Sequence, residues 1–202
     1  MKKLTIDFYK RTNVTLIAKE LLGKIIVTNF DGHITTARIV ETEAYAGITD
    51  KASHAAMGKR TARNEVMYAG GGISYVYICY GLHQMFNVVT NDSGIPHAIL
   101  VRAAEPLQGI DIMLARTGKK VDDISLTRGP GNLAKALGIS TVNTGCNLQG
   151  DDVYITADDY VLRKKHIGIS KRIGVDYAAE DALLPYRFYI KGNKFISGKP
   201  VN

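Results

Sequence analysis

Residues 24–45 constrain the fold more strongly than any other segment of the chain. Two strand-like runs, 24–30 and 34–45, are separated only by Asp31-Gly32-His33. Gly32 can adopt the positive φ of a tight turn, and so short a connection suits antiparallel strands, because parallel strands need a crossover of about a dozen residues. The sequence therefore predicts a β-hairpin within an antiparallel sheet.

The second run ends in Arg-Ile-Val-Glu-Thr-Glu-Ala-Tyr, residues 38–45. Because side chains alternate across a strand, Glu41, Glu43 and Tyr45 should project from one face. Acids on a buried strand face are costly unless they are hydrogen-bonded, paired or solvated in a cleft, and packing does not explain them. We interpret this face as the wall of an active site.

The rest of the chain is predicted to alternate between short strands and short helices. A helix capped by Asn13 or Thr15 ends at Gly23, and Gly129-Pro130 opens another helix that Gly138 closes. A helix over 107–116 would turn Ile110, Met113 and Leu114 inward. Residues 74–89 should form a second hairpin with Tyr80-Gly81-Leu82 at its tip, and further strands are predicted over 98–107, 153–155, 167–175 and 187–190. This pattern favours an α+β fold: one domain over residues 1–202, with a mainly antiparallel sheet, hairpins and flanking short helices.

Composition limits the class of protein. A chain of 202 residues that is 46% hydrophobic has enough apolar surface for one substantial core. No apolar run reaches the roughly 18 residues of a membrane span, and no signal-peptide core follows the basic start, so we expect no membrane partner and a cytoplasmic protein, nucleoid-associated if bacterial. Cys79 and Cys146 are interpreted as buried, reduced thiols. The net charge of +7 favours a polyanionic partner without identifying it.

Familiar catalytic motifs are missing from the sequence. Gly70-Gly71-Gly72 precedes a predicted strand and is not followed by Gly-Lys-Ser/Thr, so it indicates a turn rather than a phosphate loop. The sequence has no His-Glu-x-x-His motif and no Gly-x-Ser-x-Gly elbow. We therefore expect acid/base chemistry without a metal or another cofactor.

Individual residues allow a structural and a functional interpretation. Tyr75 and Tyr77 should share one strand face and could simply pack the sheet, whereas Tyr80 beside a glycine turn could wedge between stacked bases. His54 lies in a long polar loop, where a lone histidine is usually a surface residue. Arg102 follows Ile-Leu-Val in a predicted strand, and a guanidinium in so apolar a strand needs an anionic partner, for which Glu43 is the obvious candidate.

Several motifs in one order carry a resemblance that covers nearly the whole chain. The chain resembles the alkyladenine (3-methyladenine, or methylpurine) DNA glycosylases of the mammalian type. The motifs that carry the resemblance are Arg38–Tyr45, Ala52-Ser-His54, Tyr75–Gly81, Asn87, Leu100–Pro106, Gly129-Pro130 and Pro185–Tyr189. Any one of them would be weak evidence.

The resemblance implies a monofunctional base-excision enzyme that flips a damaged purine out of duplex DNA and hydrolyses its N-glycosidic bond. It implies that Glu43 activates the attacking water, which Arg102 and the backbone carbonyl of Ile173 help to hold. The flipped base would stack between Tyr45 and Tyr77, with His54 opposite Tyr45 at the base edge. Two further residues have implied roles: Asn87 would disfavour normal guanine, and Tyr80 would fill the space that the base leaves.

Some questions stay open at this stage. The sequence does not show which of 3-methyladenine, 7-methylguanine, hypoxanthine and ethenoadenine is the preferred lesion. Glu41 is expected only to make a structural hydrogen bond. Leu82 and Arg128 depart from the family pattern near the expected DNA contacts. The protein is expected to act as a monomer. The alternatives are a non-enzymatic nucleic-acid binder, which would use the tyrosines and the basic charge alone, and RNA processing on a related fold.

Overall fold

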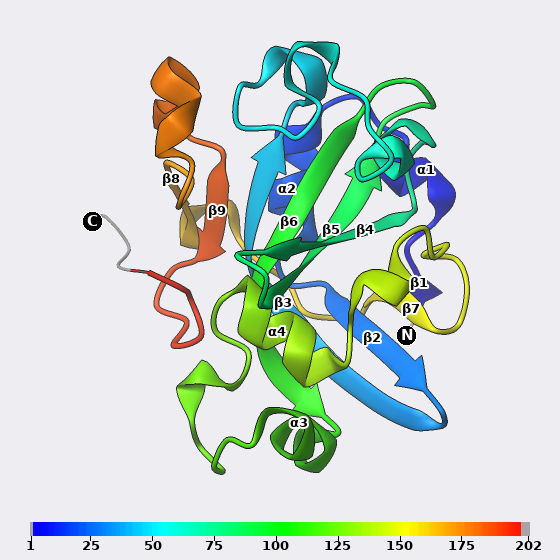
Figure 1. Cartoon of the computed structure of the whole chain (residues 1–202). Coiled ribbons are helices and arrows are strands. Elements are labelled where there is room, and N and C mark those ends of the chain that lie inside the picture. Colours follow the sequence, from blue (N-terminus) through cyan, green and yellow to red (C-terminus); the bar gives the residue numbers. More distant parts are fainter. Residues whose placement is uncertain (1, 199–202) are drawn as a thin grey trace.

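The computed structural model describes residues 2–198, and a long antiparallel sheet organises them (Figure 1). Within these residues the sheet has nine strands, in the order β1-β7-β2-β3-β6-β5-β4, with β9 pairing with both β3 and β8. The strands are β1 (Lys2–Lys3), β2 (Ile25–Phe30), β3 (His33–Tyr45), β4 (Ser74–Cys79), β5 (His83–Thr90), β6 (His97–Gln108), β7 (Val153–Ala157), β8 (Ile167–Ser170) and β9 (Arg187–Ile190). The α+β class is confirmed.

Strand β3 is the centre of the sheet. Its first half pairs with β2 through the predicted hairpin, its second half pairs with β9, and β6 runs along its other edge. Glu43 therefore lies between Leu100 of β6 and Arg187 of β9. This double pairing buries the acidic end of β3 inside the sheet.

Short helices cover both faces of the sheet, with α2 (Val14–Leu21) behind it and α4 (Pro130–Leu137) in front in the view of Figure 1. The predicted start of α2 is confirmed, because the Asn13 side chain accepts the N–H of Leu16 at 2.9 Å. The side chain of Thr42 donates to the carbonyl of Ala18 in α2, so the neighbouring Glu41 and Glu43 face the opposite side. The other α-helices are α1 (Ile6–Tyr9) and α3 (Ile110–Thr117).

The second predicted hairpin is confirmed as β4 and β5. Cys79 pairs with His83, and Tyr80 and Gly81 between them have φ values of 50° and 71°. Tyr80 is 89% exposed, so the hairpin presents an aromatic ring to solvent at its tip. Gly70-Gly71-Gly72 forms an irregular connection before β4, which agrees with the predicted turn.

Three local predictions are wrong. The helix expected over 107–116 begins only at Ile110, because β6 stays paired with β3 as far as Gln108, and Ile110 is 40% exposed rather than inward. The strand expected over 167–175 ends at Ser170 with its partner β9, so residues 171–175 leave the sheet as a loop. The free thiols of Cys79 and Cys146 are half-buried rather than buried, and Cys79 lies in the last pair of β4 and β5, next to the exposed hairpin tip.

Three-residue to eight-residue 3₁₀ segments occupy much of the remaining chain. They are η1 (Gly47–Thr49), η2 (Ala56–Gly58), η3 (Glu65–Tyr68), η4 (Ile124–Leu126), η5 (Thr141–Asn143), η6 (Lys164–His166) and η7 (Asp176–Leu183). The loop over 46–63, which contains η1 and η2, lies at the top of Figure 1, above the strands β4 and β5. No helix among residues 2–198 is both long and apolar enough to cross a lipid bilayer.

Candidate active site

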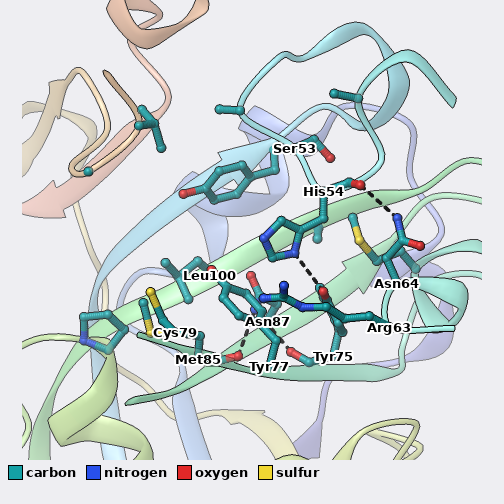
Figure 2. A pocket seen from close by; sticks show the side chains of 18 of the residues that line it. Ser53, His54, Arg63, Asn64, Tyr75, Tyr77, Cys79, Met85, Asn87 and Leu100 are labelled. Atoms are coloured by element: carbon teal, nitrogen blue, oxygen red, sulfur yellow. Dashed lines mark hydrogen bonds between the residues drawn. The ribbon is translucent and has the colours of Figure 1, made fainter. Parts of the chain in front are cut away.

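The loop over 46–63 and the strands β4 to β6 enclose a cavity of about 930 Å³. This volume is within the range of about 300–1,000 Å³ that small-molecule sites occupy. Figure 2 shows that His54 enters the cavity from the loop, whereas Tyr75, Tyr77 and Asn87 come from the sheet. The lining includes all but one of the residues predicted for the site: Tyr45, His54, Tyr77, Tyr80, Asn87, Arg102 and Ile173.

Aromatic rings form the walls of the cavity. The centroid of the His54 ring lies 4.5 Å from that of Tyr77, so these two rings pack edge to face on one side. The Arg63 guanidinium lies 5.0 Å from the centroid of the Tyr77 ring. Tyr45 supplies a separate ring from the end of β3. The cavity therefore offers several aromatic surfaces on which a planar ligand can stack.

The environment of His54 determines its charge. Burial, together with the nearby charges of Arg63 and Lys59, lowers the pKa of His54 to about 4, so the ring is neutral near pH 7. Its Nδ1 lies 2.7 Å from the hydroxyl of Tyr75, whose pKa burial raises to about 12. Arg63 approaches the same hydroxyl (Figure 2), which can donate to Nδ1 or accept from it, because its oxygen carries two lone pairs besides its hydrogen. His54 is thus held against Tyr75 in its neutral form.

Glu43 is fully buried at the edge of this cavity and is the one predicted site residue that does not itself line it. Its Oε2 accepts the Tyr45 hydroxyl at 2.8 Å and Arg102 Nη1 at 3.3 Å, and its Oε1 accepts the N–H of Ile173 at 2.8 Å. Burial, and then the Glu43 charge, raise the pKa of Tyr45 well above its usual value, so Tyr45 remains a donor. Three donors on a carboxylate, which has about four lone-pair sites, leave one site free.

Ile173 contacts Glu43 through a different atom from the one expected. The residue lies beside Glu43, but the contact runs through its amide N–H and not through its carbonyl. The reason is the early end of β8, since the loop over 171–175 turns its backbone amide toward the carboxylate. A role for the carbonyl stays a prediction.

Glu41 has a defined structural role. It is fully buried, and its carboxylate accepts Arg102 Nε at 3.2 Å, Arg187 Nε at 2.6 Å and the N–H of Ser197 at 2.6 Å. Burial lowers the pKa of Arg102, but the charges of Glu43 and then Glu41 outweigh burial and leave it raised. The predicted pairing of Arg102 with Glu43 is therefore correct, and Glu41 is a second partner. The two carboxylates and two guanidiniums balance in charge.

A second buried ion pair supports Tyr45 from behind. Arg172 donates to both carboxylate oxygens of Asp50, at 2.5 and 2.8 Å, and to the carbonyl of Ala44 at 2.9 Å. Its guanidinium carbon lies 4.8 Å from the centroid of the Tyr45 ring. Asp50 also accepts the N–H groups of Ala46 and Ala52, both at 3.0 Å, so this ion pair fixes both the loop and the ring.

Asn87 is buried and held rigidly. Its Nδ2 donates to the carbonyls of Tyr75 at 3.2 Å and Met85 at 3.0 Å, as the dashed lines in Figure 2 show. Asn87 pairs with Leu100 of β6, which keeps Arg102 in the register that reaches Glu43. The site residues predicted from the sequence thus converge, with Tyr80 at the rim.

Several residues of the site are not among those predicted from the sequence. Arg187 follows Tyr186 and precedes Phe188 in an apolar strand, where a guanidinium needs an anionic partner as it does at Arg102, so this pattern could have identified it. Arg172, Asp50 and Ser197 lie in polar segments without a distinguishing pattern. Among residues 2–198, no group of three or more His, Cys, Asp or Glu side chains is arranged to hold a metal ion.

Comparison with known proteins identifies the family of the chain. The profile of the methylpurine-DNA glycosylase (MPG) family matches residues 7–194. A provisionally named 3-methyladenine DNA glycosylase of Desulfitobacterium hafniense (strain Y51) is 45% identical over 206 residues, covering 98% of this chain and 100% of that protein. Relatives with the same provisional name are 43% identical in Clostridium perfringens (strain 13 / Type A), over 96% of this chain and 98% of that protein, and 43% identical in Alkaliphilus oremlandii (strain OhILAs), over 98% and 100%. The chain belongs to the methylpurine-DNA glycosylase family.

Proposed function

We propose that this monofunctional DNA glycosylase flips alkylated or deaminated purines out of duplex DNA and hydrolyses their N-glycosidic bond with water, leaving an abasic site. One observation carries the proposal: Glu43 is buried among three donors at the edge of an aromatic cavity and has one lone-pair site left. A protein that only bound nucleic acid would gain nothing from a buried carboxylate at this place.

Glu43 is proposed to act as the general base. A water molecule on its free lone pair would attack C1′ of the flipped nucleotide while the C1′–N bond breaks, and the carboxylate would accept the proton of that water. The negative charge of Glu43 would also stabilise the positive charge that develops on the sugar. A cationic methylated purine leaves as the neutral base and needs little further activation, whereas a neutral lesion such as hypoxanthine would leave with the electron pair of the C1′–N bond and take its proton from water.

The cavity walls suit a planar and sometimes cationic base. The base would stack between the ring of Tyr45 and the packed rings of Tyr77 and His54. Since the pKa of His54 is lowered to about 4, its ring carries no charge near pH 7 and does not repel a cationic methylated purine. Stacking tolerates many base shapes, which fits a range of lesions rather than one.

Asn87 is proposed to select against normal guanine. Its side-chain amide is held by two backbone carbonyls, so it cannot rotate away from a ligand without losing two hydrogen bonds. A guanine placed in the cavity would bring its exocyclic amino group against this fixed side chain. Undamaged pairs also cost more to unstack than damaged or mismatched ones, which adds selectivity before any bond breaks.

Duplex DNA would be bound at the rim. The exposed Tyr80 ring at the β4–β5 tip is suited to enter the minor groove and to fill the space that the flipped base leaves. The net charge of +7 supplies affinity for phosphates without sequence preference, and a monomer can make both contacts.

The test is release of free base. The protein would be incubated with duplexes that contain hypoxanthine or ethenoadenine and with methylated DNA, and the freed base and the alkali-labile abasic site would be measured. We expect release from at least one of these duplexes. Tight binding to all of them without release would favour the non-enzymatic binder, and release from the matching RNA duplex alone would favour RNA processing.

A further inference from the structure

Met57 is the most exposed large apolar side chain at the mouth of the cavity. It is 91% exposed, and it belongs to the cavity lining together with Tyr80 and Tyr177. Scattered exposed apolar residues are ordinary, but one at the mouth of a binding site is not explained by chance exposure. The exposure of Met57 at this place therefore requires a physical explanation.

The backbone at Met57 has a conformation that methionine rarely adopts. Met57 has φ 55° and ψ 26°, and Gly58 after it has φ 77°. The N–H of Lys59 donates to the carbonyl of Ala56 at 3.1 Å, so residues 56–59 form a tight turn whose two central residues both have positive φ. Asparagine, aspartate or glycine suits such a position, and a bulky side chain there is unusual.

The turn is nevertheless held firmly in place. The Asn64 side chain donates to the carbonyls of His54 and Lys59, both at 2.9 Å, and the Tyr68 hydroxyl donates to the same Lys59 carbonyl at 3.0 Å. The loop is thus fastened on both sides of Met57, which leaves the side chain projecting from a rigid support. Neither the turn geometry nor core packing accounts for a methionine here, and an outlier at a site points to function.

We propose that Met57 is a second DNA contact, which packs against the nucleotide next to the flipped one while Tyr80 occupies the vacated space. This inference rests on the proposed function for its substrate. Methionine is among the apolar side chains that enter between base steps in the minor groove, and its flexible thioether adapts to different neighbours. Lys59 closes the turn and lines the cavity with a positive charge, which suits an adjoining phosphate, whereas Arg60 after it is paired with Glu65.

If Met57 contacts DNA, its replacement should weaken DNA binding without lowering the stability of the protein. Met57→Asn keeps a residue that tolerates positive φ and removes the apolar side chain. We expect the Tm of this variant to equal that of the parent or to rise by about 1–3 °C, because the backbone strain is relieved. Its affinity for a duplex with an abasic-site analogue, and its single-turnover base release from a paired lesion, should both fall about tenfold.

Two further variants complete the experiment. Met57→Leu retains an apolar side chain and should restore affinity and release to within about twofold of the parent. Val161→Asn alters an exposed apolar residue outside the cavity lining and should change neither. Parental affinity and release in Met57→Asn would overturn the inference. The inference would also be overturned if Met57→Asn had a lowered Tm and Met57→Leu did not restore affinity and release, because that result would indicate a structural role for Met57.

The outcomes also separate this inference from the proposed function. If the parent releases no base from any duplex, the proposed function fails, but weaker binding of the abasic-site duplex by Met57→Asn would still support the contact. If the parent releases base and Met57→Asn behaves in the same way, the function stands and the contact fails.

Discussion

Replacing Glu41 by glutamine should destabilise the protein far more than the same change at Glu43, although both acids are fully buried. The partners of Glu41 are Arg102, Arg187 and the N–H of Ser197, and all of these can only donate. In either orientation of the new amide, its NH₂ group would face a donor and leave that donor without an acceptor. The loss of charge also leaves the guanidinium pair uncompensated.

At Glu43 the new amide has an alternative. One of its partners is the Tyr45 hydroxyl, which can turn from donor to acceptor, while the N–H of Ile173 keeps the remaining oxygen. The contact with Arg102 at 3.3 Å is the longest of the three. The rearranged hydrogen bonds should therefore preserve most of the stability of this part of the site.

The magnitudes follow from these contacts. Removing one partner of a buried ion pair costs about 3–5 kcal/mol, and we take the lower end, about 3 kcal/mol, for Glu41→Gln because one acceptor survives. For a chain of this size 1 kcal/mol corresponds to about 2–4 °C in Tm, so the Tm should fall by about 6–12 °C. Glu43→Gln also removes a charge beside Arg102, but Arg102 keeps Glu41 and the Ser197 hydroxyl as acceptors, so this variant should lose less, about 1–2 kcal/mol.

The assay is thermal and urea unfolding of the parent and the two variants, followed by circular dichroism. A smaller loss for Glu41→Gln than for Glu43→Gln would refute this reasoning. A loss below about 1 kcal/mol for Glu41→Gln would refute it as well, because it would show that the carboxylate is not needed to hold the two arginines.

Two other predictions concern pH and the wedge. The pKa of His54 is about 4 in the folded protein and about 6.5 in the unfolded chain, so the unfolded state binds the proton first, and stability is full above pH 6.5 and falls as pH decreases to 4. After allowance for solvent near this partly exposed ring, the loss of unfolding free energy should be about 1–2 kcal/mol. His54→Gln has an oxygen that can accept from Tyr75 and should reduce this pH dependence, as measured by urea titrations between these pH values. An unchanged pH dependence in the variant would show that His54 is not the titrating group. Tyr80→Ala should leave the unfolding free energy within about 0.5 kcal/mol, because the ring is 89% exposed, but should slow single-turnover release from a paired lesion more than from an unpaired one. Equal slowing on both substrates would argue against the wedge.

The part of the site that the sequence predicts is the part built from local patterns. The alternation of Glu41, Glu43 and Tyr45 survives in β3 because a strand has a period of two, and the tip at Tyr80 follows from a tight turn between two strand-like runs. Arg102 could be paired with an acid because a guanidinium in an apolar strand requires one. These features need no knowledge of distant residues.

The remainder depends on contacts between distant segments. The N–H of Ile173, a residue that only the family resemblance associates with Glu43, reaches that carboxylate across 130 residues, and the N–H of Ser197 reaches Glu41 across 156. Neither segment carries a pattern that reveals its partner, since backbone amides are the same in every residue. The Arg172–Asp50 pair and the strained turn at Met57 are hidden for the same reason, because long-range packing and not local propensity determines them.

Glu43 is proposed to perform the chemistry while other residues bind and position the DNA. The decisive measurement is single-turnover release of the damaged base by the parent and by Glu43→Gln, with affinity for an abasic-site duplex measured in parallel. Release should fall by at least about a hundredfold in the variant while DNA affinity is retained. Undiminished release by Glu43→Gln would contradict this role and would assign the activation of water to another group.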